Sequence, residues 1–92
     1  FMMLGRKSAS EKLASFLCVL ADRVGAPLGA YTQIDLPMSR SDIADFLGLT
    51  TETISRTMTQ LRHANVISLE TVHKVIVLDP EGLLAMAEGE DD

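Results

Sequence analysis

Apolar side chains recur every three to four positions between residues 8 and 24, and this period predicts an amphipathic helix. The apolar positions are Leu13, Phe16, Leu17, Leu20 and Val24. Ser8 or Ser10 is expected to cap the start of this helix, and Glu11 follows Ser8 at the spacing of a possible capping box. Residues 25–27 are expected to end the helix, since they combine glycine with proline.

The pattern changes after residue 27. Residues 28–32 have no regular period and are expected to form a loop. Residues 33–38 alternate polar and apolar side chains, which predicts a short, half-buried strand. Pro37 indicates that this strand lies at the edge of a sheet or ends there, because proline cannot donate to a strand ladder.

Two further helices are predicted close together, over residues 39–47 and 51–64. Ser39 and Thr50 stand where N-caps are needed. Gly48 lies between the helices and tolerates the left-handed conformation that commonly ends a helix. The connection therefore leaves almost no slack, and the two helices must cross at a tight turn.

The second of these helices has two distinct faces. Its apolar stripe consists of Ile54, Met58 and Leu61. Nearly opposite, at about 100° per residue, lies a polar stripe of Glu52, Arg56, Thr59 and His63, with Ser55 at its edge. Two short helices at a glycine-containing turn, the second with a polar outer face, form the plan of a helix-turn-helix, in which the second helix enters the DNA major groove.

The remainder of the chain completes a winged helix-turn-helix. Residues 66–69 and 74–78 are rich in β-branched side chains and predict a hairpin joined by residues 70–73. Asp79 and Pro80 mark the start of a last short helix. The expected fold class is therefore mainly α with a small β-wing, as one domain over the whole chain. The acidic residues 88–92 are expected to be disordered and solvated.

Composition limits the class of protein. At 92 residues with 47% hydrophobic side chains, the chain suits a single globular domain. It has no run of about 18 apolar residues, so no membrane helix is expected. A single cysteine, Cys18, permits no intrachain disulfide and fits the cytoplasm, and its place in an apolar pattern favours a buried, inert thiol over a reactive one.

The net charge of −5 counts against DNA binding, because DNA-binding domains are usually basic. Six of the thirteen acidic residues nevertheless fall within the last fourteen positions. Without those six, seven acids stand against eight bases, so non-specific attraction to phosphate is expected to be weak.

No catalytic or cofactor site is predicted. His63 and His73 have no cysteine partners at zinc spacing, and no glycine-rich phosphate loop follows a strand. The carboxylates are scattered over expected helix surfaces. The chain is therefore not expected to be an enzyme or to hold a metal or cofactor.

The candidate base-reading residues are Glu52, Ser55 and Arg56. Arginine presents two parallel donors that match guanine O6 and N7, and glutamate accepts from cytosine N4. Glu52 is also placed to hold the Arg56 guanidinium in its reading pose. A plain surface ion pair at this i,i+4 spacing is an equally open interpretation.

Candidate phosphate contacts surround this helix. Its amino terminus attracts anions through free N–H groups and the helix dipole. The first helix of the pair crosses the backbone in this plan, and a wing lies near a neighbouring phosphate. The residues concerned are Arg40, Ser41, Thr50, Thr51, Thr53, His73 and Lys74.

The stretch from Pro37 to Arg56 closely resembles the C-terminal domain of the cyclic-AMP-receptor/FNR family of bacterial transcription regulators. The most specific part is Leu49-Thr50-Thr51-Glu52-Thr53-Ile54-Ser55-Arg56, which resembles the FNR/FixK branch and its Glu-x-x-Ser-Arg recognition helix. The cyclic-AMP receptor differs at two of these positions, with Arg in place of Thr51 and Gly in place of Ser55.

The resemblance implies a role for each matching residue. Arg56 is expected to read guanine, Glu52 the opposite strand and Ser55 a thymine, in a TTGA-type half-site. It also implies a longer regulator with an effector-sensing β-roll and a dimerising helix. Such a protein binds a palindromic double-stranded DNA operator as a homodimer and contacts RNA polymerase.

The alternative is a winged helix used for protein–protein contact, with no base reading. The near-neutral charge favours this alternative, whereas the threonine cluster and the Glu-x-x-Ser-Arg spacing favour DNA.

Overall fold

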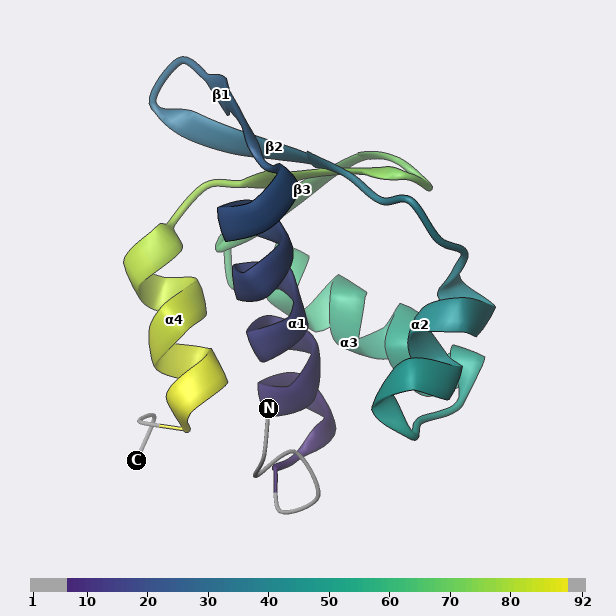
Figure 1. Cartoon of the computed structure of the whole chain (residues 1–92). Helices are drawn as coiled ribbons and strands as arrows, with labels where there is room; N and C mark the ends of the chain where they lie inside the picture. The colour runs from purple at the N-terminus through teal and green to yellow at the C-terminus, as the bar shows by residue number, and fades with distance from the viewer. Residues whose placement is uncertain (1–6, 90–92) are drawn as a thin grey trace.

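The computed structural model describes residues 7–89 and arranges four helices around a small antiparallel sheet (Figure 1). The elements are α1 (Ala9–Val24), β1 (Ala26–Leu28), β2 (Tyr31–Asp35), α2 (Arg40–Leu47), α3 (Thr51–His63), β3 (Ile67–Thr71), β4 (Lys74–Val77) and α4 (Pro80–Glu88). The sheet lies across one end of the neighbouring helices α1 and α4, and α2 and α3 lie to the other side of α1. This is the winged helix-turn-helix that the sequence predicts.

One hydrophobic core joins these elements. It includes Leu13 and Leu17 of α1, Ile43 of α2 and Ile34 of β2, all fully buried. The fully buried side chains of α3 are Ile54, Met58 and Leu61, at 0–1% exposure. Because α3 gives one complete face to the core, its opposite face is held at the surface in a fixed orientation.

Local capping sets where the helices begin, as predicted. Ser8 accepts from the Glu11 backbone N–H and Glu11 accepts from the Ser8 N–H, forming a capping box on α1. Ser39 and Asp42 form the same reciprocal pair on α2. These bonds satisfy backbone donors that have no partner within the helix.

The sheet order is β1-β2-β4-β3. The helix α1 ends where residues 25–27 predicted, at Val24 with Gly25 as its C-cap. The loop predicted over residues 28–32 was wrong, because Ala26–Leu28 forms a strand that pairs with β2, with Ala26 opposite Gln33. The strand β2 is consequently interior, with Ile34 opposite Val75 of β4. Pro37 lies beyond the strand, which ends at Asp35, in agreement with the second interpretation of that proline.

Two boundaries in the C-terminal part also differ from expectation. Glu70 and Thr71 continue β3, with an irregular register between Leu69 and Thr71, so the wing turns over Val72 and His73 alone. Glu88 lies in α4, and Gly89 ends that helix in the left-handed conformation. These two residues are therefore ordered, although the sequence placed them in the disordered tail. Residues 90–92 of that tail lie outside the described part of the chain.

Candidate nucleic-acid interface

The turn between α2 and α3 is fixed by backbone hydrogen bonds. Gly48 adopts φ 73° and donates to the carbonyls of Ala44 and Asp45. The Leu49 N–H donates to the Ala44 carbonyl at 2.8 Å, and the Leu49 side chain packs against the core. Thr50 then caps α3 by accepting from the Thr53 N–H at 3.1 Å. Three residues therefore connect the helices, and each of them makes at least one hydrogen bond within the turn or to an adjoining helix.

The face of α3 that points away from the core carries the three predicted base-reading residues. Glu52, Ser55 and Arg56 are all exposed. They belong to the first half of the helix, which is the part of a recognition helix that contacts base edges. The buried face also contains Thr57, at 3% exposure, which the apolar pattern did not indicate.

Arg56 is oriented by threonine and not by Glu52. Its Nη2 donates to Thr53 Oγ1 at 3.3 Å, and the Thr50 hydroxyl donates to that same oxygen at 2.9 Å. Within residues 7–89 no ion pair joins Glu52 to Arg56, because the guanidinium turns back three residues instead of four. The simple surface ion pair is therefore not formed in the free chain, and the orienting role of Glu52 in the reading pose stays a prediction.

The amino terminus of α3 is accessible. Thr50 and Thr51 are exposed and Thr53 is half-buried. The Thr50 hydroxyl caps the helix by accepting from the Thr53 N–H, as the ordinary interpretation of such a cluster predicts, and it donates to the Thr53 hydroxyl. The first turn also lies at the positive end of the helix dipole.

Arg40 and Ser41 open α2 beside this terminus. Ser41 is exposed, whereas the Arg40 side chain is half-buried. Arg40 Nη1 is fully buried and has no hydrogen-bond partner among the described residues. Burial of the guanidinium lowers the pKa of Arg40. This nitrogen therefore lacks the acceptor that a buried charged donor requires.

The wing is attached to the segment that enters α2. The backbone N–H of Leu36 donates to the His73 carbonyl at 2.7 Å, and the His73 N–H donates to Thr71 Oγ1 at 3.2 Å. The His73 side chain is exposed and Lys74 is half-buried. Both predicted wing residues thus lie at the tip of a hairpin whose position is tied to the helix pair.

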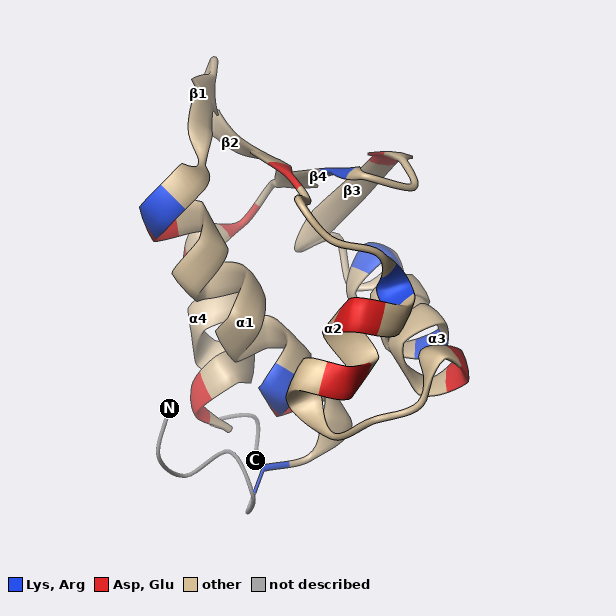
Figure 2. Ribbon diagram, turned by 45° about the vertical axis from the view of Figure 1, so that its right-hand side comes forward, with Lys and Arg blue, Asp and Glu red and all other residues tan. Residues whose placement is uncertain are grey.

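Charged positions are unevenly distributed around these elements (Figure 2). Lysine and arginine positions occur on α3, at the start of α2 and on β4, while acidic positions occupy the outer part of α2 and the start of α3. Sequence reasoning missed Arg62, which is exposed in the last turn of α3. It lies seven residues after Ser55, about two turns along the same face, and that spacing was the available signal.

Other chemistry is not indicated. Within residues 7–89, no three His, Cys, Asp or Glu side chains are grouped to hold a metal ion. No helix among the described elements is both long and apolar enough to cross a membrane. Cys18 is half-buried, and burial, with the nearby Glu88 carboxylate, raises the pKa of its thiol.

Comparison with known proteins gives a consistent result. Residues 11–86 match the family described as the Crp-like helix-turn-helix domain. The nitrogen fixation regulation protein FixK of Azorhizobium caulinodans is 48% identical over 83 residues, covering 89% of this chain and 34% of that protein. The transcriptional activator protein FnrL of Cereibacter sphaeroides is 44% identical, covering 99% of this chain and 38% of that protein.

The solved structure of FixK2 from Bradyrhizobium japonicum superposes with a TM-score of 0.82 at 36% identity. It covers 92% of this chain and 41% of that one. The chain therefore spans little more than a third of the length of these curated relatives. The expectation that it is not an enzyme is confirmed by the regulators to which it is similar.

Proposed function

The chain belongs to the family of Crp-like helix-turn-helix domains, and we propose that it is the DNA-binding domain of a transcription regulator. The observation that carries this proposal is the outer face of α3. Glu52, Ser55 and Arg56 are exposed on a helix whose opposite face is fully buried. Because packing already fixes the backbone of this helix, binding in a groove requires no further ordering of that backbone.

In the proposed complex, α3 lies in the major groove. Arg56 donates two parallel N–H groups of its guanidinium to guanine O6 and N7, Glu52 accepts from the opposite strand, and Ser55 contacts a thymine, within a TTGA-type half-site. The bond to Thr53 keeps the Arg56 side chain along the helix before binding. A neutral hydroxyl partner is easily exchanged for a base, which supports a reading role more than a buried ion pair would.

Phosphates are proposed to bind around this helix. One site is the amino terminus of α3, with its backbone N–H groups and Thr51. Arg40 and Ser41 at the start of α2 form a second, and His73 with Lys74 on the wing a third. The exposed Ser41 and the positive charge of Arg40 support the second site, and the buried Arg40 Nη1, which has no acceptor in the free chain, would gain a phosphate oxygen as acceptor if the guanidinium turned outward on binding.

The remaining proposals concern a longer protein. We infer that the chain is one domain of a cytoplasmic homodimer that binds a palindromic operator and contacts RNA polymerase. Two recognition helices then occupy successive major grooves about 34 Å apart.

A protein-binding role is the second candidate. The net charge of −5 favours it, and so does Phe46, which is 60% exposed on α2. An aromatic side chain of this exposure is typical of protein contacts more than of phosphate contacts. The two roles respond differently to salt, because only DNA binding releases condensed counterions.

The test is fluorescence anisotropy of the chain with a TTGA-containing palindromic duplex and a scrambled duplex, at several salt concentrations. Arg56→Ala is expected to cost about 1–3 kcal/mol on the palindrome and little on the scrambled duplex. Arg23→Ala is the matched control, since Arg23 is an exposed arginine in the last turn of α1, far from α3. Equal losses on both duplexes would exclude base reading by Arg56. Binding to neither, by the single chain and by a covalently linked pair of chains, would favour the protein-binding role.

A further inference from the structure

Lys12 connects α1 to the end of α2. Its Nζ donates to the carbonyl oxygen of Leu47 at 3.1 Å, across 35 positions of sequence, and the bond is partly buried. Leu47 is the last residue of α2, directly before the Gly48 turn. A Cβ placed at Gly48 would lie only 3.9 Å from the same Nζ, so the ammonium is close to the turn itself.

The Leu47 carbonyl needs an external donor. The last carbonyls of a helix have no intrahelical partner. The turn supplies backbone N–H groups to Ala44 and Asp45 only, through Gly48 and Leu49. Lys12 provides a charged donor at the negative end of the α2 dipole, where a cation is favoured. It therefore acts as a C-cap supplied by another helix.

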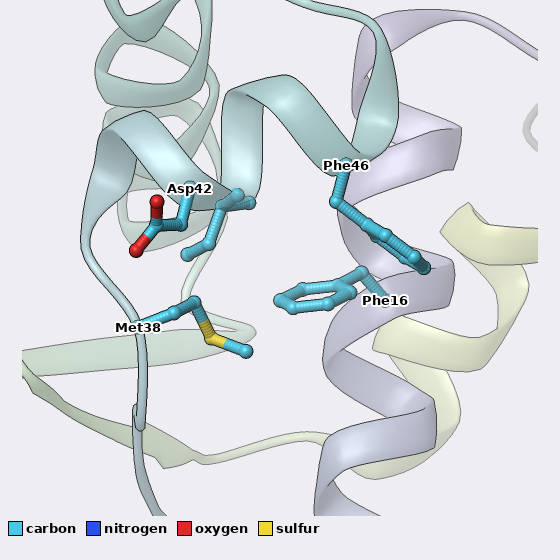
Figure 3. A pocket seen from close by; sticks show the side chains of 5 residues that line it. Phe16, Met38, Asp42 and Phe46 are labelled. Atoms are coloured by element: carbon cyan, nitrogen blue, oxygen red, sulfur yellow. The ribbon is translucent and has the colours of Figure 1, made fainter.

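Side chains make most of the connection between α1 and α2. The helix α1 packs directly against α3, α4 and β2. It meets α2 through Phe16 and Phe46, whose ring centroids are 5.7 Å apart at 50°. Figure 3 shows these rings facing each other from their two helices, beside a pocket also lined by Met38 and Asp42. Because this junction has few contacts besides the ring pair and borders a pocket, the directional bond from Lys12 is one of the few attachments between α1 and α2.

We propose that Lys12 is a positioning residue that sets the orientation of the α2–α3 pair relative to the wing. The proposal rests on the DNA-binding role proposed above. Because only three residues join Leu47 to the first residue of α3, fixing the end of α2 fixes the amino terminus of α3. The wing is tied to the opposite end of α2, because the backbone N–H of Leu36, in the segment that enters α2, donates to the His73 carbonyl. If α3 and the wing contact one duplex at the same time, both attachments must hold these two elements at compatible positions.

A second contact supports this arrangement. Ser10, two residues before Lys12, lies 3.4 Å from Gln60 Oε1 of α3 through its hydroxyl. The first turn of α1 therefore reaches α3 as well as the end of α2. Lys12 itself is half-buried and already engaged, so its ammonium is not displayed for a phosphate in the way that an exposed lysine is.

The test compares Lys12→Met, which keeps the apolar stem, with Lys12→Arg, which keeps the charged donor. Arg23→Met controls for the loss of one positive charge. Lys12→Met is expected to lower affinity for the palindromic duplex about five- to tenfold, within the range of mutations that alter coupling between sites. Affinity for a scrambled duplex and the salt dependence of binding should stay within error, and Lys12→Arg should restore most of the loss.

Amide chemical shifts of the free protein give a readout that is independent of DNA. Lys12→Met should shift the amide signals of Gly48, Leu49 and the first turn of α3, whereas Arg23→Met should not. A salt slope reduced by about one would make Lys12 a phosphate ligand and overturn the proposal. If Lys12→Met leaves the affinity for the palindrome unchanged and lowers the melting temperature, Lys12 only stabilises the fold and the proposal is wrong. If neither the unmodified chain nor a covalently linked pair of chains prefers the palindrome, the DNA-binding role fails, and the amide shifts alone then decide whether Lys12 sets the turn.

Discussion

Replacing Arg40 with methionine is expected to stabilise the free chain while weakening its binding to DNA. The reason is the state of the Arg40 guanidinium, whose Nη1 is buried without a hydrogen-bond partner among the described residues. Burial also lowers the pKa of Arg40, because the charged form is separated from water. Methionine retains an unbranched apolar stem and removes the charged head.

The magnitude follows from the cost of a buried donor without an acceptor. That cost is about 1–3 kcal/mol for a fully buried group. Arg40 is only half-buried, so solvent screening places the expected gain near the lower end, at about 1 kcal/mol. In a domain of this size, such a gain raises the melting temperature by roughly 4–8 °C. Arginine stays charged in proteins, so the gain should be the same at acidic and alkaline pH.

DNA binding should change in the opposite direction. On binding, the Arg40 guanidinium would turn outward so that Nη1 gains a phosphate oxygen as its acceptor, and methionine cannot make this contact. Loss of one phosphate contact lowers the slope of log K against log salt by about 0.9. The loss should be similar on palindromic and scrambled duplexes, because phosphates carry no sequence information.

Two assays decide the outcome: thermal unfolding followed by circular dichroism, and anisotropy titration over a series of salt concentrations. Arg23→Met serves as the control, because Arg23 is an exposed arginine in the last turn of α1, outside the candidate interface, and its loss should change stability by less than about 0.5 kcal/mol. A lower melting temperature for Arg40→Met would show that the guanidinium stabilises the free fold. An unchanged salt slope would show that it does not bind phosphate. Either result would refute the reasoning.

Three further predictions concern the turn and the thiol. Gly48→Ala should destabilise the chain by about 1–2 kcal/mol in urea titrations, because φ is 73° there, and Gly48→Asn should cost less. Thr50→Ala should remove the α3 cap at a cost of about 1 kcal/mol, with Thr50→Ser retaining it, as measured by the same titration. The Cys18 thiol should react with a disulfide reagent more slowly than glutathione at neutral pH, and Glu88→Gln should raise its rate, because burial and Glu88 both raise the thiol pKa. The thiol pKa is lower in the unfolded chain than in the folded chain, so the unfolded chain loses its proton at a lower pH. The contribution of Cys18 to the free energy of unfolding should therefore fall as pH rises through the ordinary thiol pKa.

Features set by neighbouring residues were predictable from the sequence. The capping boxes of Ser8 and Ser39 and the left-handed Gly48 depend on contacts within three or four positions, and the structure confirms each. The strand β1 was missed because Ala26–Leu28 is exposed at every position and has no alternation. The segment is a strand only because it pairs with β2, and its own three residues contain no pattern that predicts this pairing.

The same division applies to the candidate interface. Exposure of Glu52, Ser55 and Arg56 follows from a helical period and was predictable. The partner of Arg56 was not, because the spacing permits Glu52 and Thr53 equally and only side-chain geometry selects Thr53. The bond from Lys12 to Leu47 joins residues 35 positions apart, which no local pattern records.

The low net charge constrains how such a domain can recognise DNA. The helix pair and wing carry four basic residues, namely Arg40, Arg56, Arg62 and Lys74. The same elements carry the acidic residues Asp42, Asp45, Glu52 and Glu70, so this side of the chain is close to neutral. More distant acids on α4 matter less, because salt screens charges beyond about 8–10 Å. One copy can therefore neutralise only a few phosphates, and its non-specific affinity should be small. Under that condition base contacts supply a larger share of the binding free energy. Useful affinity then requires two copies of the domain on one duplex, because once the first copy is bound the second binds its half-site at high effective concentration.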